Sequence, residues 1–322
     1  MRGDGKIVVL SGGVGGAKLV HGLAQVIPPE RLVVVVNTGD DFKHLGLRIC
    51  PDLDTVTYTL AGLADPKRGW GRANETWNFM AALKQLGAED WFNLGDRDLA
   101  LHVQRMQRLA QGESLTEVTA GICRNLGISS ALLPMSNDPV ATIVETPDGP
   151  LAFQHYFVRD RCLPNVTGFR FDGIDRARAN PALLHLFADC VVSAVIIAPS
   201  NPYVSVDPIL ALAEFRSALD AFCGPIVAVS PIIGRKAIRG PAAKMMQEMG
   251  VPPTVIGIAA HYQGTIDGLV IDKTDHAQAD EVIQQRIDVR VEQTVMHTLE
   301  DRVMLARACL EFAGVLIRKG VR

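Results

Sequence analysis

The sequence predicts an α/β protein with a Rossmann-like fold, in which a mainly parallel sheet is covered by helices on both faces. Short β-branched runs recur along the chain, and each ends in a turn rich in Gly, Pro, Ser, Asn or Asp. The runs are apolar throughout, which is typical of strands that are buried on both faces. No internal repeat or low-complexity linker interrupts the chain, so we expect a single domain over residues 1–322.

Six apolar runs are the expected strands of this sheet. The first run leads into a glycine-rich turn and a helix expected over residues 15–27. A last helix is expected over residues 297–318, packed back on the sheet. The runs are KIVVL at 6–10, RLVVVVN at 31–37, VVSAVIIA at 191–198, PIVAVS at 225–230, TVIGIAA at 254–260 and GLVID at 268–272.

Two further regions have patterns of their own. Residues from about 55 to 130 contain four segments of helical period with glycine at or near their ends, and they predict a helical insertion or cap on the sheet. Residues from about 140 to 158, VATIVETPDGPLAFQHYFV, predict a β-hairpin whose turn is the Pro-Asp-Gly sequence.

Composition narrows the classes of function. Apolar residues make up 48% of the chain, enough for a sizeable core, and the net charge of −3 argues against a nucleic-acid binder. The longest near-apolar run, residues 190–199, has about half the length of a membrane span, and the opening MRGDGK lacks the apolar core of a signal peptide. Six scattered cysteines without a C-x-x-C pair indicate reduced thiols. We therefore expect a soluble, cytoplasmic protein.

The glycine-rich turn after the first strand is the first candidate site. It fails the dinucleotide fingerprint G-x-G-x-x-G because Lys18 stands at the third glycine position, and it fails the P-loop pattern because Leu19 follows that lysine. Four glycines nevertheless exceed what a turn requires, and backbone N–H groups at a helix N-terminus favour an anion. The candidate phosphate-binding residues here are Ser11, Gly12, Gly13, Gly15, Gly16 and Lys18.

Carboxylates follow the second expected strand. Asp40 and Asp41 come just after Asn37, and Asp52 and Asp54 are close behind. Several carboxylates at one strand end can hold a divalent metal on a diphosphate, or accept a proton from an attacking alcohol. We take Asp40, Asp41 and Asp54 as candidate catalytic residues and Asp40 and Asp41 as candidate Mg²⁺ ligands. An alternative for Asp54 is to cap the helix that DTVTYTL begins.

Three more polar loops follow apolar stretches. In LGDRDLALH, Arg97 between Asp96 and Asp98 is either an anion clamp or part of a solvated turn. The loops APSNPYVSVDP and SPIIGRKAIRGPAAK suit a nucleobase, ribose or phosphate, although ordinary strand-to-helix loops would look similar. Their candidate residues are Ser200, Asn201, Ser205, Ser230 and Gly234. The eight histidines form no metal-binding pattern. The residues thus predict a protein that binds a nucleoside diphosphate compound.

Six ordered segments together resemble the 2-phospho-L-lactate transferases (the CofD/FbiA-like family), from about residue 6 to the C-terminal helix. They are SGGVGGAKL, NTGDDFKHLGLRICPDLDTVTYTLAG, GRANETWNF, LGDRDLALH, APSNPYVSVDPIL and SPIIGRKAIRGPAAKMM. The resemblance implies a Mg²⁺-dependent transferase of coenzyme F(420) biosynthesis. Such an enzyme moves a phospho-acid from its guanosine diphosphate-linked donor to the deazaflavin alcohol FO and releases GMP. The lactyl, enolpyruvyl and glyceryl donors remain open.

The same resemblance assigns roles to single residues. Asp54 and Arg97 match positions that contact the deazaflavin, Asn37 is placed beside them, and the APSNP and SPIIG loops would hold the guanosine. We expect small-molecule substrates, no nucleic acid, no membrane and a homodimer. One alternative is a related regulatory branch, a gluconeogenesis or morphogenesis factor that binds nucleotide-type ligands without transfer. PDLDT and LGDRDLALH favour the transferase, and the failed fingerprint disfavours an NAD-dependent oxidoreductase.

Overall fold

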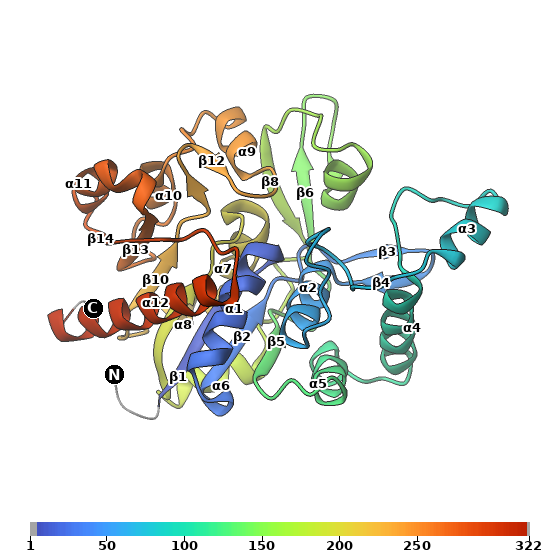
Figure 1. Ribbon diagram of the computed structural model, residues 1–322, viewed down its shortest axis with the longest axis horizontal. Helices are drawn as coiled ribbons and strands as arrows, with labels where there is room; N and C mark the ends of the chain where they lie inside the picture. Colours follow the sequence, from blue (N-terminus) through green and yellow to red (C-terminus); the bar gives the residue numbers. More distant parts are fainter. Residues whose placement is uncertain (1–4, 321–322) are drawn as a thin grey trace.

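A parallel sheet of seven strands forms the centre of the computed structural model, which describes residues 5–320 (Figure 1). The strand order is β14-β13-β10-β9-β1-β2-β5. The chain runs outward from β1 to β2 and β5 and then returns to the other flank of β1 at β9. The order reverses between β1 and β9, which is where open parallel sheets bind ligands. The strands are β1 (Lys6–Ser11), β2 (Leu32–Val36), β5 (Ala131–Pro134), β9 (Val192–Ile197), β10 (Ile226–Val229), β13 (Gly268–Asp272) and β14 (Asp288–Glu292).

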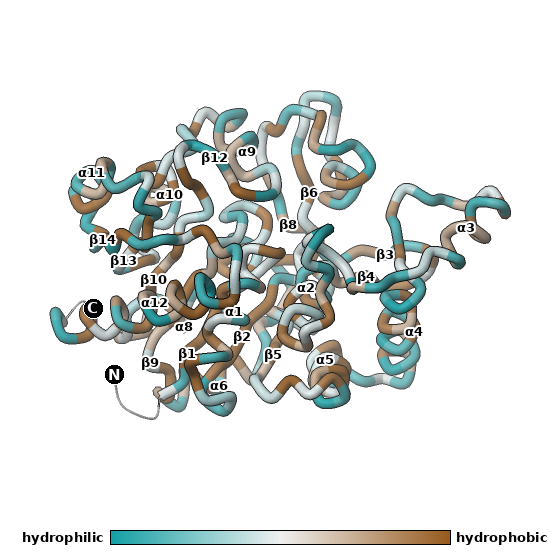
Figure 2. Tube along the Cα trace, in the orientation of Figure 1, coloured by the Kyte–Doolittle hydropathy of each residue, from teal (hydrophilic) through white to brown (hydrophobic). Residues whose placement is uncertain are grey.

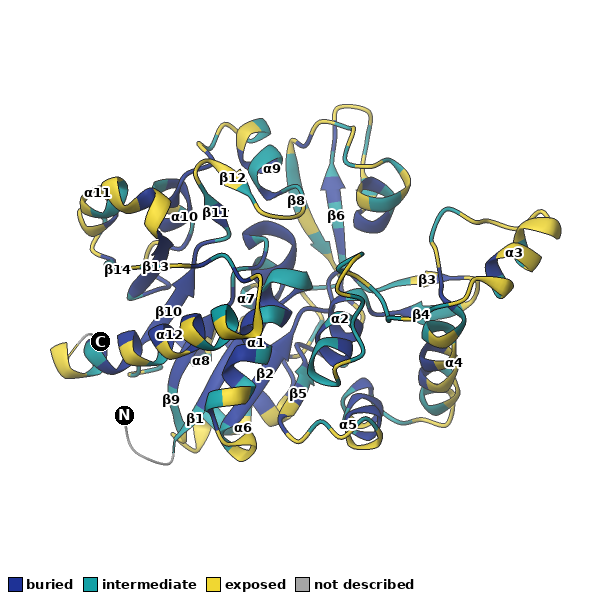
Figure 3. Ribbon diagram, in the orientation of Figure 1, coloured by how far each residue is buried: buried dark blue, intermediate teal, exposed yellow. Residues whose placement is uncertain are grey.

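Alternate residues of the central strands enter two hydrophobic layers, one on each face of the sheet. In β1, Val8 and Leu10 belong to one layer, whereas Ile7 and Val9 belong to the other. Each of the four is at most 1% exposed, which explains why the strand is apolar without alternation. The central strands are dark blue in Figure 3 and mostly brown in Figure 2. The predicted two-sided α/β fold is confirmed.

Helices complete both layers. The layer that contains Ile7 and Val9 is covered by α1, α2, α5 and α12, and the opposite layer by α6 to α11. None of the helices within residues 5–320 combines the length and apolar character needed to cross a membrane. The helices of these layers are α1 (Gly13–Val26), α2 (Pro51–Leu60), α5 (Leu115–Asn125), α6 (Pro181–Ala188), α7 (Asp207–Leu210), α8 (Ala213–Asp220), α9 (Ala242–Glu248), α10 (Val255–His261), α11 (Ala279–Ile283) and α12 (Leu299–Lys319); short irregular helical turns cover Pro29–Arg31, His155–Arg159, Pro202–Val206 and Lys273–Gln278.

One expected strand is wrong. The run TVIGIAA forms the helix α10 instead of a strand. Two prolines precede it, and the Thr254 side chain accepts a hydrogen bond from the Gly257 N–H at 3.1 Å, which caps the helix N-terminus. The other five expected strands are confirmed as β1, β2, β9, β10 and β13. We did not predict β5 and β14, because ALLP and DVRVE are short or alternate with charged residues.

The helical insertion is confirmed. It contains α2, α3 (Asn78–Gln85), α4 (Asp96–Ala110) and α5. Figure 1 shows α3 and α4 on an arm that projects from the body together with the hairpin of β3 (Phe42–His44) and β4 (Leu47–Ile49). We did not predict this hairpin. Its two turn residues, Leu45 and Gly46, both have positive φ, as a tight two-residue hairpin turn requires.

The segment between α2 and α4 contains all three tryptophans of the chain, Trp70, Trp77 and Trp91. The Arg68 guanidinium lies 5.2 Å from the Trp70 ring and 5.1 Å from the Trp77 ring. Trp91 packs edge-on against Phe92, at 5.7 Å between ring centroids. The tryptophans therefore belong to this peripheral insertion and not to the two core layers.

The predicted hairpin near residues 140–158 is confirmed, with a short second arm. β6 (Ala141–Glu145) pairs antiparallel with β7 (Leu151–Ala152), and the chain then enters the helical turn His155–Arg159. A third strand, β8 (Gly168–Asp172), pairs with the other edge of β6. A further small hairpin, β11 (Ile232–Ile233) with β12 (Lys236–Ala237), follows β10.

Candidate active site

The glycine loop lies at the reversal of strand order. Ser11 ends β1, Gly12 caps α1 and Gly13 begins it with a φ of 61°, a left-handed value that favours glycine. The Gly12 N–H donates to the Ser200 hydroxyl at 3.1 Å, and this hydroxyl donates to the Gly12 carbonyl at 2.7 Å. Gly15 approaches the Pro199 carbonyl. The loop after β1 and the loop after β9 are thus joined at the switch point.

Two predicted loop residues extend this junction. Gly16 approaches the Ser11 and Ser200 hydroxyls, and the Ser11 Oγ is buried without a hydrogen-bond partner among the described residues. Ser205 is buried, and its side chain would lie within 3.0 Å of a Cβ at Gly12. These residues form a cradle of hydroxyl and N–H groups at the first turn of α1.

A carboxylate already occupies part of this cradle. The Gly13 N–H donates to Asp52 Oδ1 at 2.6 Å, and Asn37 Nδ2 donates to Asp52 Oδ2 at 3.0 Å. Asn37 is fixed in turn, because its Oδ1 accepts the Gly39 N–H at 2.7 Å. Pro51 starts α2, which places Asp52 in the first helical turn, facing the loop. Burial raises the pKa of Asp52 to about 6, against the effect of the hydrogen bonds from Asn37 and Gly13.

Asp40 is the second buried carboxylate of the site. It is 6% exposed, and its Oδ1 has no hydrogen-bond partner among the described residues. Burial raises the pKa of Asp40 well above its usual value, and the negative charge of Asp52 raises it further. Two carboxylates therefore share a region of low dielectric with too few positive partners.

The donor set at this point fits a divalent cation. Residues 5–320 contain no group of three or more His, Cys, Asp or Glu arranged to hold a metal. Mg²⁺, however, is typically held by one or two carboxylates together with substrate phosphates and water. Asp40 and Asp52 provide two such carboxylates, one with an unpartnered oxygen, next to the N–H groups of the glycine loop.

Asp41, the other predicted metal ligand, has a cationic partner of its own. Arg48 Nη2 donates to Asp41 Oδ2 at 3.1 Å, and the Cys50 thiol donates to the same oxygen at 3.0 Å. Burial raises the pKa of Asp41 to about 6, and the charge of Arg48 opposes that rise. Its Oδ1 is buried without a partner among the described residues, so one oxygen remains available.

Asp54 belongs to a buried network between α2 and α4. The alternative that it caps a helix is wrong, because α2 begins three residues earlier at Pro51. The Arg105 guanidinium binds both oxygens of Asp54, with Nη1 to Oδ2 at 3.2 Å. Arg105 is 3% exposed. Asp54 is therefore a carboxylate with a buried cationic partner, unlike Asp40 and Asp52.

The network continues along one face of α4. His102 Nε2 lies 3.4 Å from Asp98 Oδ2, and the Tyr58 hydroxyl donates to Asp98 Oδ1. Burial raises the pKa of Asp98, but His102 and Tyr58 outweigh burial and the pKa is lowered overall. Asp98, His102 and Arg105 are spaced four and three residues apart, so they share a helix face. This spacing indicates in the sequence that Arg105 and His102 lie beside Asp98, although we did not predict either residue for the site.

Arg97 is exposed in the first turn of α4. The predicted clamp between two aspartates is not formed, because Asp96 accepts hydrogen bonds from Thr76 and Asn78 while Asp98 holds Tyr58. These bonds, that from Thr76 first, lower the pKa of Asp96 to about 2. Within the described chain the Arg97 guanidinium makes no hydrogen bond or ion pair, so it faces solvent at the start of α4.

The remaining predicted residues have separate contacts. Asn201 Oδ1 accepts the Tyr203 N–H at 3.1 Å, and the Ser230 hydroxyl bonds within its own loop to the Ile232 backbone. The Gly234 N–H donates to the Asp275 carboxylate, with a closest distance of 3.0 Å. Lys18 donates to the Met296 carbonyl at 2.7 Å. The residues brought into direct contact at the switch point are Ser11, Gly12, Gly13, Gly16, Asn37, Asp52, Ser200 and Ser205.

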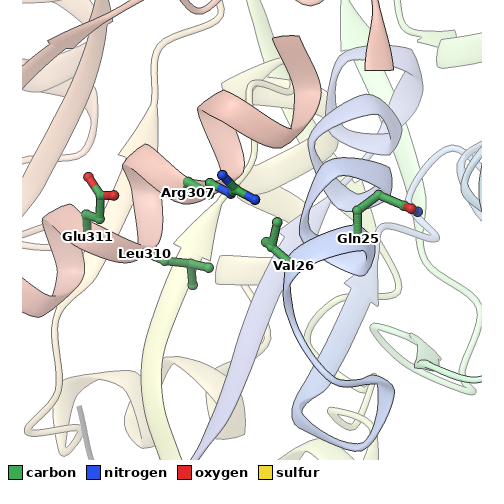
Figure 4. A pocket seen from close by; sticks show the side chains of 5 residues that line it. All are labelled: Gln25, Val26, Arg307, Leu310 and Glu311. Carbon is green, nitrogen blue, oxygen red and sulfur yellow. The ribbon is translucent and has the colours of Figure 1, made fainter. Parts of the chain in front are cut away.

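A surface cleft of about 400 Å³ lies away from this site (Figure 4). Its walls are the C-terminal end of α1 and the middle of α12, so it is at the opposite end of α1 from the glycine loop. None of the predicted site residues lines it. The residues that line it are Gln25, Val26, Arg307, Leu310 and Glu311.

The fold and the site together define a Rossmann-like protein. A glycine-rich loop and two buried carboxylates lie where its strand order reverses. The family model described as "2-phospho-L-lactate transferase CofD" matches residues 7–308. The chain therefore belongs to this family of transferases.

Similar proteins agree over nearly the full length. The chain is 40% identical to the phosphoenolpyruvate transferase of Kitasatospora aureofaciens, over 96% of this chain and 98% of the relative. It is 38% identical to the 2-phospho-L-lactate transferase of Methanosarcina mazei, over 95% and 99% of the two chains. A crystal structure of a UPF0052 family member from Bacillus halodurans covers 96% of this chain and 100% of that one, with a TM-score of 0.61 and 14% identity, and shares the fold.

Proposed function

We propose that the protein transfers a phospho-acid from a guanosine diphosphate-linked donor to the terminal ribityl hydroxyl of the deazaflavin FO. Family membership supports transfer, and the printed names of the relatives, phosphoenolpyruvate transferase and 2-phospho-L-lactate transferase, support a small phospho-acid as the group that moves. The acid itself stays open, because relatives with both names are about equally similar to this chain. A cytoplasmic homodimer also stays a prediction.

One observation carries the proposal: the Asp52 carboxylate sits on the glycine-loop N–H group beside the buried Asp40. A diphosphate approaching this loop meets two carboxylates, so its binding requires a cation between them. We infer that Mg²⁺ is held by Asp40 and Asp52. When bound, this ion supplies charge neutralisation on the phosphate that is transferred. Asp52 is a better candidate for the second ligand than Asp41, because Asp41 already has the Arg48 guanidinium as its partner.

The chain's own residues then position the reactants. The FO hydroxyl oxygen forms a bond to the phosphorus that bears the acid, and the bond from that phosphorus to the bridging oxygen breaks. GMP leaves with the electron pair. Asp54, held in place by Arg105, accepts a hydrogen bond from the hydroxyl and orients it. Asp41 accepts the hydroxyl proton at its free Oδ1, because a carboxyl pKa of about 6 suits proton transfer near neutral pH.

The direct test is turnover. Purified protein is incubated with FO, Mg²⁺ and the lactyl, enolpyruvyl or glyceryl donor, and products are identified by mass spectrometry. We expect a phosphodiester of FO and an equal amount of GMP with at least one donor. Absence of both products with all three donors would contradict the proposal.

A further inference from the structure

Basic side chains gather on the flank of α1 that faces α12. Lys18 Nζ donates to the Met296 carbonyl at 2.7 Å, and Arg302 Nη1 contacts His21 Nδ1 at 2.9 Å. Lys18 and His21 are three residues apart on α1, so they leave the helix on one face. Arg302 lies in the first turn of α12, and a Cβ at Gly22 would be 2.1 Å from its carbonyl oxygen. The two helices are therefore in close contact where these cations meet.

These cations have no carboxylate partner within the described residues. Lys18 binds a carbonyl and Arg302 binds a histidine, while Arg302 Nε is buried with no hydrogen-bond partner. The nearby Asp301 is already used, because its carboxylate accepts the N–H groups of His297 and Thr298 at 2.9 and 2.7 Å.

The electrostatics agree with this geometry. Burial lowers the pKa of Lys18, and the positive charges of Arg302 and Arg239 lower it further, outweighing the negative charge of Asp301. Burial also lowers the pKa of His21, which keeps its Nδ1 an acceptor for Arg302. The charged forms of Lys18 and His21 are therefore disfavoured, and a bound anion would stabilise them.

Arg239, on the loop after β12, is exposed, and its Nη1 donates to the Arg68 carbonyl at 3.2 Å. Its guanidinium is therefore held against another loop, although its charge acts on Lys18. Lys18 and Arg302 are called the basic flank below.

The order of the strands places this flank relative to the substrate. α1 packs between α2 and α12. The carboxylates Asp40 and Asp52 belong to the β2 and α2 side, whereas α12 packs over β10, β13 and β14. The loops after β9 and β10, which we expect to hold the guanosine, are on the α12 side of β1. Figure 1 shows α12 beginning beside the N-terminal part of α1. The nucleoside half of a donor and the basic flank therefore share one side of the glycine loop.

We propose that Lys18 and Arg302 form an anion subsite for the nucleoside-side phosphate of the donor, the phosphate that leaves as GMP. This inference rests on the proposed function. When the bond from phosphorus to the bridging oxygen breaks, negative charge grows on that phosphate, and fixed cations stabilise it. The subsite thus assists the leaving group, while Asp40 and Asp52 serve the phosphate that is transferred.

Calorimetric titration with GDP and with GMP, both in the presence of Mg²⁺, tests the subsite. We expect Lys18→Gln and Arg302→Gln each to weaken binding of both nucleotides by about tenfold, the effect of losing a hydrogen bond to a charged group. Arg307→Gln is the matched control, because Arg307 is an α12 arginine at the distant cleft of Figure 4 and should change affinity by less than about twofold. Arg302→Lys keeps the charge and should retain most of the affinity.

The outcomes separate this inference from the proposed function. Unchanged GDP and GMP affinity in Lys18→Gln and Arg302→Gln overturns the subsite, even if the wild-type protein makes the FO product. Weakened GDP binding with unchanged GMP binding also overturns it, since the cations would then serve the transferred phosphate. Weakened binding of both nucleotides by a protein that makes no product upholds the subsite and contradicts the transfer. Thermal melts of each variant show whether a loss reflects unfolding.

Discussion

The two sides of α1 carry opposite charges: Asp40 and Asp52 form an acidic flank on the α2 side, and the basic flank lies on the α12 side. Each flank has too few partners of opposite charge. On the α2 side, Asp40 and Asp52 are buried and their pKa values are raised. On the α12 side, the pKa values of Lys18 and Arg302 are lowered, chiefly by burial. In each flank, burial makes the charged form of the side chains unfavourable. A ligand of opposite charge lowers the free-energy cost of that charged form when it binds. The site is therefore arranged for a cation on one side of α1 and an anion on the other.

The largest expected effect tests Asp54, the α2 carboxylate that is paired with Arg105. Arg105→Met leaves Asp54 buried without its guanidinium, so we expect the free energy of unfolding to fall by about 3–5 kcal/mol. Urea denaturation measures this. The double variant Asp54→Asn, Arg105→Met should lose clearly less, because no unpaired charge remains. Equal losses in both variants would show that packing, not charge, holds this network.

Removing a charge from the acidic flank should separate stability from activity. We expect Asp40→Asn to slow Mg²⁺-dependent GMP release by at least about 100-fold, because the cation loses a ligand. The free energy of unfolding of the ligand-free protein should rise, since a buried carboxyl group whose charged form is disfavoured is gone. A variant that is slower and also less stable would break the assignment of Asp40 as a strained metal ligand. Asp138→Asn, outside the site, is the control.

The contact between α1 and α12 supports the basic flank. Gly22→Ala places a methyl group 2.1 Å from the Arg302 carbonyl oxygen, so α12 must shift. We expect a loss of about 1–3 kcal/mol in unfolding free energy from this overpacking, and weaker GDP binding as Arg302 moves. Thermal melting and calorimetry measure the two effects. Gly314→Ala is a matched control, because the closest atom to its added methyl is 3.7 Å away.

The smallest effect is a dependence on pH. Asp52 has a pKa of about 6 in the folded protein, above its value in the unfolded chain, so its contribution to stability is present at low pH and is lost as pH rises through about 6. Between about pH 4 and 7 the ligand-free protein should thus lose stability on the order of 1–2 kcal/mol as pH rises. Mg²⁺ with GDP should flatten this slope. A ligand-free protein whose stability rises over that interval would contradict the raised pKa values.

The sequence predicted the edge of the sheet at which the site lies, but not the contacts within it. Apolar runs locate strand ends, and parallel strands bring those ends together, so Ser11, Asn37 and Ser200 could be placed at one edge. The hydrogen bond from the Gly13 N–H to Asp52 depends on how α2 packs against α1, and no local sequence pattern predicts that packing. The pairing of Asp41 with Arg48 likewise depends on how the chain folds back between β3 and β4, which no local pattern predicts.

The fold shows a similar division. β-branched runs correctly predicted five of the seven strands of the sheet. The prediction of a strand for TVIGIAA is wrong, because the cap that Thr254 provides stabilises a helix there despite the strand propensity of the run. The edge strands were harder to predict, because β5 is only four residues long and β14 alternates with charged residues.

The location of Trp70, Trp77 and Trp91 has a practical consequence for spectroscopy. Because all three indoles lie in the segment between α2 and α4, tryptophan emission reports on that segment and not on the sheet. Far-ultraviolet circular dichroism reports on the whole backbone. If the insertion opens before the body, the two signals will give separate melting curves, whereas coincident curves indicate one cooperative unit.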